Sequence, residues 1–232
     1  MVVGAADAFH LTYCSNIHPG ETWTEIDKNL RTYLPPLKAQ LAPDQSFGVG
    51  LRLSNQAAEE LLSNNHLAEL NAFLDENDLY VFTINGFPYG SCHQEVVKDR
   101  VYAPDWRTTE RVTYTKRLAR ILARLLPEGV EGGISTSPIS YKPWMDQGQW
   151  ADTFKTAARH LAEVTAELVE LRERTGRLVH IDIEPEPNCL LENTRETVDF
   201  FTEWLFPVGR EYLADGLGIT PEAGEDLLRR HV

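Results

Sequence analysis

Short runs of apolar and β-branched residues alternate along the chain with longer stretches in which apolar residues recur every three or four positions. The short runs predict β-strands, because they are bounded by polar or glycine-containing turns. They begin at Phe9 (FHLTYCS), Phe47 (FGVGLRLS), Leu79 (LYVFTIN), Val130 (VEGGIST) and Leu178 (LVHIDIE). The intervening stretches have the periodicity of amphipathic helices, over 22–34, 57–76, 111–126, 150–176 and 194–213.

Residues at the ends of these helical stretches agree with the assignment. Gly176 follows a long helical stretch, as expected of a glycine that ends a helix in the left-handed conformation. Thr220 precedes Pro221 and a further amphipathic segment, which is the pattern of a helix N-cap. The chain therefore consists of five strand-then-helix units followed by one more helix.

Strict alternation of strands and helices predicts a parallel sheet, because parallel neighbours need a crossover long enough to hold a helix. An open doubly wound sheet is one candidate, but its first strand-to-helix turn, CSNIHPGETW, has no G-x-G-x-x-G motif. The other is a TIM-type (β/α)8 barrel, which gathers polar residues at the strand ends. Such residues follow every predicted strand: Asn16 and His18, Arg52 and Ser54, Asn85, Ser135 to Ser137, and Glu184 with Glu186.

The length of the units bears on how much of a barrel is present. Five units occupy most of the 232 residues, whereas a full barrel has eight. We therefore expect residues 1–232 to form a single barrel domain that is incomplete at its C-terminal end. Such a chain has open strand edges, and we expect a partner copy or the missing segment to cover them.

Composition and charge exclude several classes of ligand and location. No apolar run approaches the length of a membrane span and no signal-type segment follows Met1, so we expect a cytoplasmic protein. Three widely spaced cysteines indicate neither a disulfide framework nor a zinc site, and Cys14 and Cys189 are expected to pack as small apolar groups. A formal net charge of −13 argues against nucleic acid as a ligand.

Several separated segments resemble the EboE family, which is described as metabolite-traffic proteins of the xylose isomerase-like TIM-barrel superfamily. They are LTYCSNIHPGETW, FGVGLRLS, LYVFTINGFPYG, VYAPDW, ISTSPISYKPW and IDIEPEPNCLLE, between Leu11 and Glu192. The resemblance implies a barrel that processes or moves secondary-metabolite precursors, including prenylated or lipid-like ones. It also implies a divalent metal ion (Mg, Mn or Zn), with Glu184 as the ligand from the fifth strand. The chain departs from the family pattern at two places: at Asn188, where a glycine is expected after EPEP, and at Cys92 beside His93.

Glu184 and Glu186 stand two positions apart where the fifth strand ends, each followed by a proline. In a continuing strand both side chains would point to one side, where two carboxylates repel each other unless a cation or a proton lies between them. One interpretation is a metal site with Glu184 as ligand and Glu186 as catalytic base. The other is a pair of salt bridges to Arg52 or Lys142.

Three further residues are candidates for catalysis or for holding an anionic group. His18 follows the first strand and is a candidate catalytic residue, or else a loop histidine bonded to the backbone. Lys142 is a candidate base or anion-binding group, although most lysines lie on the surface. Arg52 is the one charged residue inside an apolar strand, and it either clamps a ligand or pairs internally with Glu184 or Asp182.

The long aromatic segment after the third strand predicts a lid or binding loop, with a plug of the barrel end or a subunit interface as alternatives. The candidate substrate-binding residues are Arg52, Asn85, Tyr89, His93, Trp106 and Tyr141. Two functions remain open. One is a metal-dependent isomerase, epimerase or hydrolase that acts on a small metabolite. The other is a non-enzymatic metabolite-binding or carrier protein that uses the same barrel mouth.

Overall fold

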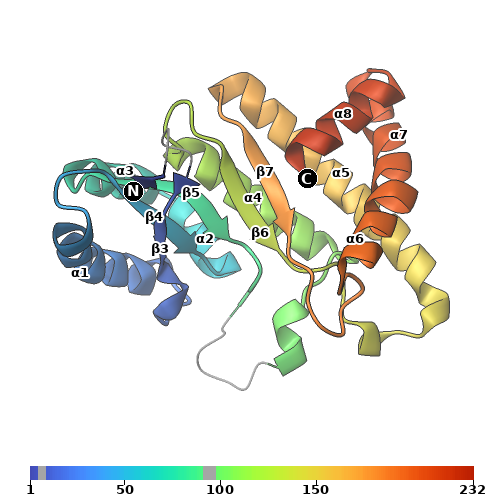
Figure 1. Ribbon diagram of the computed structural model, residues 1–232, viewed down its shortest axis with the longest axis horizontal. Helices are drawn as coiled ribbons and strands as arrows, with labels where there is room; N and C mark the ends of the chain where they lie inside the picture. Colours follow the sequence, from blue (N-terminus) through green and yellow to red (C-terminus); the bar gives the residue numbers. More distant parts are fainter. Residues whose placement is uncertain (5–8, 91–97) are drawn as a thin grey trace.

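The protein is a mixed α/β structure built on a five-stranded parallel sheet flanked by helices (Figure 1). The computed structural model describes residues 1–4, 9–90 and 98–232. The sheet strands are β3 (Thr12–Cys14), β4 (Phe47–Arg52), β5 (Leu79–Asn85), β6 (Gly132–Thr136) and β7 (Val179–Ile183). The helices are α1 (Trp23–Leu41), α2 (Asn55–Leu62), α3 (His66–Glu76), α4 (Thr109–Leu125), α5 (Trp150–Thr175), α6 (Thr194–Phe200), α7 (Phe206–Leu217) and α8 (Pro221–His231).

The strands lie in the sheet in the same order as in the sequence, β3-β4-β5-β6-β7, and all are parallel. A doubly wound sheet reverses its strand order at an interior switch point. The described strands contain no such reversal. A small antiparallel pair, β1 (Val2–Val3) with β2 (Phe9–His10), precedes the sheet. All five predicted parallel strands are therefore present, and their order excludes a doubly wound arrangement of the described strands.

The described helices α2, α4 and α5 pack on one side of the sheet. Alternate strand residues such as Val49, Val81 and Ile181 are buried in the hydrophobic core together with α2, α4 and α5. A β-carbon at Gly132 would touch leucines of α4, whereas one at Gly133 would touch His180 and Asp182. Successive residues of a strand point to opposite sides. His180 and Asp182 therefore lie on the side away from the helices.

A β-bulge in β5 changes which residues face each side. Val49 of β4 pairs with Val81, but the next residue, Gly50, pairs with Thr83, so Phe82 is the extra residue. The burial of β5 follows this shift, because Ile84 is buried while Thr83 is only half-buried. The bulge thus turns Thr83 and Asn85 toward the side of the sheet opposite these helices.

Two predicted helices are interrupted. The helix expected over 57–76 is two helices, α2 and α3, separated at Asn64, which adopts a left-handed φ of 51°. Asparagine tolerates this conformation better than most residues, and it ends the helical hydrogen bonding. The helix expected over 194–213 contains a π-helical turn, Phe201–Leu205, before Pro207 in the first turn of α7. The predicted caps at Gly176 and Thr220 are confirmed.

The outer strands of the sheet differ in what lies beside them. α8 packs near β7, and Nδ1 of the buried His231 lies 2.7 Å from the carbonyl oxygen of Val179. β3 and β7 are the first and last strands of the sheet. The expectation that a partner or a further segment covers these edges stays a prediction. Within the described part of the chain, no helix is both long and apolar enough to cross a membrane.

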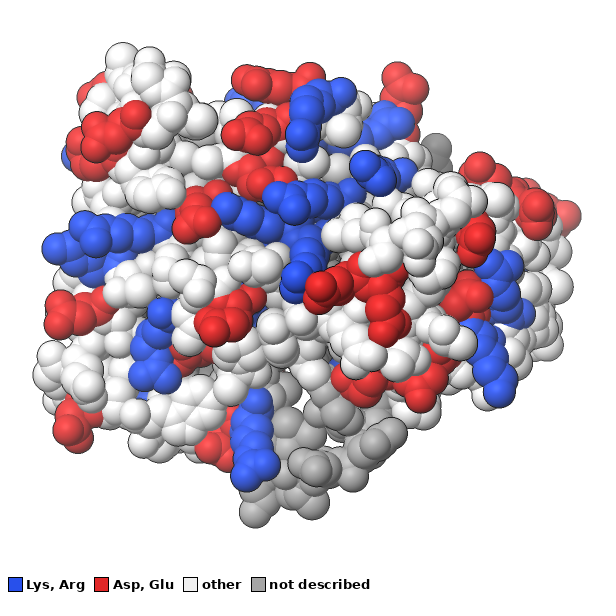
Figure 2. Space-filling model, turned by 180° about the vertical axis from the view of Figure 1, so that it is seen from behind, with Lys and Arg blue, Asp and Glu red and all other residues white. Residues whose placement is uncertain are grey.

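Basic and acidic side chains are interspersed on the face of the molecule shown in Figure 2. Ion pairs connect neighbouring helices: Lys116 to Glu163 at 2.8 Å and Arg120 to Glu167 at 2.7 Å both join α4 to α5. Arg120 is one of the basic residues of the segment from Arg117 to Arg124, and its charge is thus paired within the chain. The prediction that nucleic acid is not a ligand stays a prediction.

Candidate functional site

The carboxyl ends of all five parallel strands border one cavity of about 180 Å³. The loop after β3, the ends of β4, β5 and β6, and the residue that follows β7 each contribute to its wall. The lining residues are Cys14, Asn16, Gly50, Leu51, Thr83, Asn85, Ser135 and Glu184. In parallel α/β proteins this edge is where ligand sites are generally found. The cavity is therefore the candidate functional site.

Among the described residues of the cavity wall, Glu184 is the charged one. Its backbone N–H donates to the carbonyl of Thr136 at 3.0 Å, which extends the pairing of β7 with β6 by one residue. Desolvation raises the pKa of Glu184 even though the side chain is largely exposed, and the negative charges of Glu186 and Asp182 raise it further. A hydrogen bond with Ser135 opposes this shift in pKa. Glu184 therefore combines a position in the cavity with a negative electrostatic environment.

Glu186 has different partners from Glu184. The Tyr102 hydroxyl donates to Glu186 Oε2 at 2.7 Å, and the Glu186 backbone N–H donates to the carbonyl of Leu191. Burial, followed by this hydrogen bond, raises the pKa of Tyr102 far above its usual range, so the phenol keeps its proton. Tyr102 also stacks on Tyr141, with ring centroids 5.3 Å apart. Glu186 thus lies beside an aromatic cluster rather than among the cavity-lining residues.

The two cysteines differ in exposure. Cys189 is fully buried, and burial raises the pKa of its thiol to about 11, which confirms that it packs as a small apolar group. The same prediction is wrong for Cys14, which is exposed and lines the cavity. A β-carbon at Gly50 would lie 3.1 Å from Cys14 Sγ. The absence of a side chain at Gly50 therefore leaves room for the thiol beside β4.

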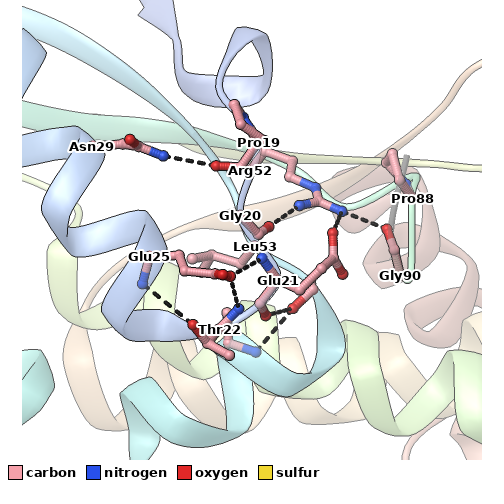
Figure 3. Close-up of polar contacts among 12 residues, drawn as sticks. Pro19, Gly20, Glu21, Thr22, Glu25, Asn29, Arg52, Leu53, Pro88 and Gly90 are labelled. Carbon is pink, nitrogen blue, oxygen red and sulfur yellow. Dashed lines mark hydrogen bonds and ion pairs between the residues drawn. The ribbon is translucent and has the colours of Figure 1, made fainter. Parts of the chain in front are cut away.

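Arg52 is a buried brace between two loops (Figure 3). Its side chain is 2% exposed; Nη1 donates to the Gly20 carbonyl at 2.5 Å, and Nη2 donates to Glu21 Oε1 at 3.1 Å and to the Gly90 carbonyl. The internal pairing considered from the sequence therefore occurs, with Glu21 as the carboxylate in place of Glu184 or Asp182. Arg52 is not among the residues that line the cavity, and its proposed contact with a ligand stays a prediction.

The loop that Arg52 braces is held along residues 86–90. Four of its carbonyl oxygens, at residues 86, 87, 89 and 90, each accept a hydrogen bond from elsewhere in the chain. In order, the donors are Arg111 Nη1 for the first two, the Asn55 backbone N–H and Arg52 Nη2. The Tyr114 hydroxyl lies 3.2 Å from the Pro88 carbonyl, but its one proton has a closer acceptor, the Leu53 carbonyl at 2.6 Å. Burial lowers the pKa of Arg111 to about 10, but the guanidinium remains charged at neutral pH.

Lys142 is also bound within the chain. Its Nζ lies 2.8 Å from both Glu192 and Glu196, near the N-terminus of α6. Desolvation lowers the pKa of Lys142, but the hydrogen bonds to the two carboxylates outweigh it and raise the pKa overall. A lysine that stays charged is poorly suited to act as a base at neutral pH. Its predicted partner, Glu184, is not part of this cluster.

His18 follows the short 3-10 helix Ser15–Ile17 that comes directly after β3. Its Nε2 is 2.6 Å from the Tyr13 hydroxyl, and its ring stacks on Tyr33 with centroids 4.1 Å apart. Together with Arg52, His18 lines a separate small cavity of about 10 Å³, whose wall does not include Glu184. The structure therefore does not bring the predicted catalytic residues His18, Lys142 and Glu186 to the same cavity.

The predicted substrate-binding residues are similarly dispersed. Asn85 lines the cavity, and its Oδ1 accepts a hydrogen bond from the Phe87 N–H. Trp106 is fully buried, with Nε1 donating to Thr136 Oγ1 at 3.1 Å, and so lies in the core rather than on a pocket wall. Tyr89 contacts the ring of Tyr114 edge-on. His93 lies outside the described residues.

Sequence reasoning missed Thr83 as a lining residue, although the pattern of β5 contains a signal for it. Leu79, Val81 and Ile84 are apolar, so the strict two-residue alternation breaks between Val81 and Ile84. Such a break is what a β-bulge produces.

Comparison of the chain with family models, with curated proteins and with solved structures gives no match in any of the three.

Proposed function

We propose that the five units belong to a xylose isomerase-like (β/α)8 barrel of the EboE type, with a small-molecule site at the carboxyl ends of its strands. The observation that carries the proposal is the cavity that all five strands border, with Glu184 in its wall. The sequential strand order supports it, since successive neighbours around a closed barrel are also successive in sequence. The segments that resemble the EboE family supply the strands and loops of this edge.

The donor groups of the cavity fit an oxygen-seeking divalent ion. Glu184 supplies one carboxylate, and Asn16, Asn85, Thr83 and Ser135 supply amide and hydroxyl oxygens. Mg²⁺ binds through one or two carboxylates and retains several waters. Zinc requires three or four side-chain ligands, and no group of three or more His, Cys, Asp or Glu side chains in the described ranges is arranged to hold a metal ion. Mg²⁺ or Mn²⁺ therefore fits these residues better than Zn²⁺ does.

The residues around the cavity suit isomerase- or epimerase-type chemistry on a small hydroxylated metabolite. A divalent ion supplies polarisation of a substrate carbonyl or hydroxyl oxygen when it is bound. Glu184 would hold the ion, and Asn16 and Asn85 would orient the substrate by hydrogen bonding. The predicted base, Glu186, is not among the described cavity-lining residues; its carboxylate accepts a hydrogen bond from the Tyr102 hydroxyl at 2.7 Å, and no proton transfer is assigned to it.

The experiment that tests this proposal is Mn²⁺ binding to the purified chain, measured by the loss of the free-ion electron paramagnetic resonance signal. We expect one site per chain, lost in Glu184→Gln because an amide is a weaker ligand than a carboxylate. The control is Glu128→Gln, which removes the same charge from an exposed turn outside the cavity. Equal Mn²⁺ binding by the wild type and the Glu184→Gln variant would refute the metal site.

An aromatic cluster next to Glu186 favours one second candidate, a carrier of a prenylated or lipid-like metabolite. Phe87, Tyr102, Tyr141 and Trp144 form a chain of ring contacts with centroids 5.3 to 5.7 Å apart. Such rings supply apolar area for an unsaturated ligand. A carrier should bind a prenyl alcohol equally well with Glu184 or with alanine at that position. A requirement of Glu184 for such binding would exclude this candidate.

A further inference from the structure

We propose that the cavity at the strand ends, when it holds no metal ion, takes ligands that are uncharged or positively charged, such as hydroxylated or amine-bearing small molecules, and rejects phosphorylated and carboxylated ones. This inference rests on the proposed function only in placing the ligand in this cavity. It concerns the metal-free cavity, because a divalent ion bound to Glu184 would reverse the local charge.

The described part of the cavity wall carries a negative charge. Among the eight described residues that line the cavity, Glu184 is the one that carries a charge at neutral pH, and none of the eight is a Lys, Arg or His. Of the neighbouring acidic residues, Asp182 pairs with His180 at 2.8 Å, whereas Glu186 has no Lys or Arg partner among the ion pairs of the described ranges. The local charge is therefore negative, and it disfavours an anionic group.

Arg52 and Lys142 are the two cationic residues that the sequence offers for holding an anionic ligand. A phosphate or carboxylate site generally uses Arg or Lys donors that are directed at the ligand. The Arg52 guanidinium is instead directed at Gly20, Glu21 and Gly90, as Figure 3 shows, and it is 2% exposed. The Lys142 ammonium lies between Glu192 and Glu196.

Turning either cationic side chain toward a ligand would be energetically unfavourable. Turning Arg52 outward would leave two carbonyls and the Glu21 carboxylate without their donor. Turning Lys142 outward would leave two carboxylates close together. A buried acceptor without its donor is unfavourable, and so are like charges in proximity. The cavity therefore recognises ligands through one carboxylate and neutral amide and hydroxyl groups.

The cavity contains a reporter for its own electrostatic potential. The Cys14 thiol is exposed in the cavity wall, whereas Cys189 is fully buried. Methanethiosulfonate reagents react with a thiolate, which attacks the sulfenyl sulfur to form a mixed disulfide and releases methanesulfinate. The thiol proton passes to the buffer. Because reagents of this class exist with trimethylammonium and sulfonate groups of similar size, the ratio of their rates reports the local potential.

The experiment measures the rates of both reagents at Cys14 in a chain with Cys92→Ser, at low ionic strength and in EDTA-treated, metal-free buffer. Each rate is divided by the rate for 2-mercaptoethanol to remove intrinsic reactivity. Cys14 and Glu184 line the same cavity from the first and last strands of the sheet. We therefore expect the cationic reagent to react about threefold faster than the anionic one, the ratio for one unit charge about 10 Å away in water at low ionic strength. Glu184→Gln should remove most of this preference, and Glu128→Gln, which changes the net charge equally, should retain it.

Two results would overturn the inference. One is an anionic reagent that reacts as fast as the cationic one in the wild-type cavity. The other is a cation preference that is the same in Glu184→Gln and Glu128→Gln, since it would then come from the net charge of the chain and not from the cavity. Mn²⁺ binding is measured separately. A cation preference without Mn²⁺ binding would refute the metal site alone, whereas Mn²⁺ binding without the preference would refute this inference alone.

Discussion

The brace formed by Arg52 should contribute measurably to the stability of the fold, and Arg52→Met tests this. Methionine keeps an apolar chain in the buried space but donates no hydrogen bonds. Its introduction leaves the Gly20 and Gly90 carbonyls and the Glu21 carboxylate without their donor. Each deprived buried acceptor costs about 1–3 kcal/mol. The ion pair itself adds about 1 kcal/mol or less, because Glu21 is 26% exposed and water replaces part of it.

Two effects offset part of this loss. Arg52 Nε is buried without a hydrogen-bond partner among the described residues, and methionine removes that unsatisfied donor. Methionine also avoids the desolvation of a charge. We therefore expect a net loss of about 3 kcal/mol in the free energy of unfolding, from urea denaturation with an unchanged slope. For a chain of this size this corresponds to a melting temperature lower by about 6–12 °C.

Two variants serve as controls for Arg52→Met. Glu21→Gln removes the charge but keeps an oxygen acceptor, so we expect a loss of about 1 kcal/mol or less. Arg195→Met removes an exposed arginine whose partner is Asp199, and it should leave the urea midpoint unchanged. If Arg52→Met unfolds at the wild-type urea concentration, the guanidinium is not a structural brace and the argument that it is unavailable to a ligand fails.

Two further predictions follow from close packing and from a titrating pair. Gly86→Ala should destabilise the fold by about 1–3 kcal/mol in thermal denaturation, because its β-carbon would lie 2.8 Å from three atoms, one of them a backbone oxygen. Gly148→Ala is the control and should be neutral, because its β-carbon would meet nothing within 4 Å. The hydrogen bond with Asp182 raises the pKa of His180, so this pair stabilises the fold below the unfolded histidine pKa, and the stabilisation is lost as pH rises through the folded pKa. Asp182→Asn should accordingly destabilise the chain more at about pH 6 than at about pH 9. An NMR titration of this variant should show a lower His180 pKa. An equal loss of stability at both pH values would contradict the pairing of His180 with Asp182.

Local patterns predicted the parts of the fold that local forces determine. The apolar runs from Phe47 and Leu178 became β4 and β7, because alternate apolar residues there must be buried against helices. Gly176 and Thr220 act as caps because their conformations and hydrogen bonds involve residues only a few positions away. The break at Asn64 was missed because the apolar periodicity continues across it, and one residue in a left-handed conformation does not alter that pattern.

The composition of the site was harder to predict because it depends on pairing between distant segments. The partner of Arg52 is Glu21, 31 positions away, and no sequence pattern distinguishes Glu21 from Glu184 as a partner for a strand arginine. Thr83 reaches the cavity only because the bulge at Phe82 shifts the register of β5 against β4. Strand-end polarity did identify Glu184 and Asn85 as cavity residues, since the carboxyl ends of parallel strands meet at one edge.

The hydrogen bonds to the main-chain carbonyls of residues 86, 87, 89 and 90 have a consequence for how this loop tolerates substitution. These acceptors belong to the backbone, so the hydrogen bonds themselves do not depend on the side chain at each position. Gly86 and Phe87 are still constrained by packing, because a β-carbon at Gly86 would meet three atoms at 2.8 Å and Phe87 is buried. Tyr89, which is partly buried against the ring of Tyr114, is therefore the position at which side chains of other sizes show whether the backbone hydrogen bonds hold the loop without a side-chain contact.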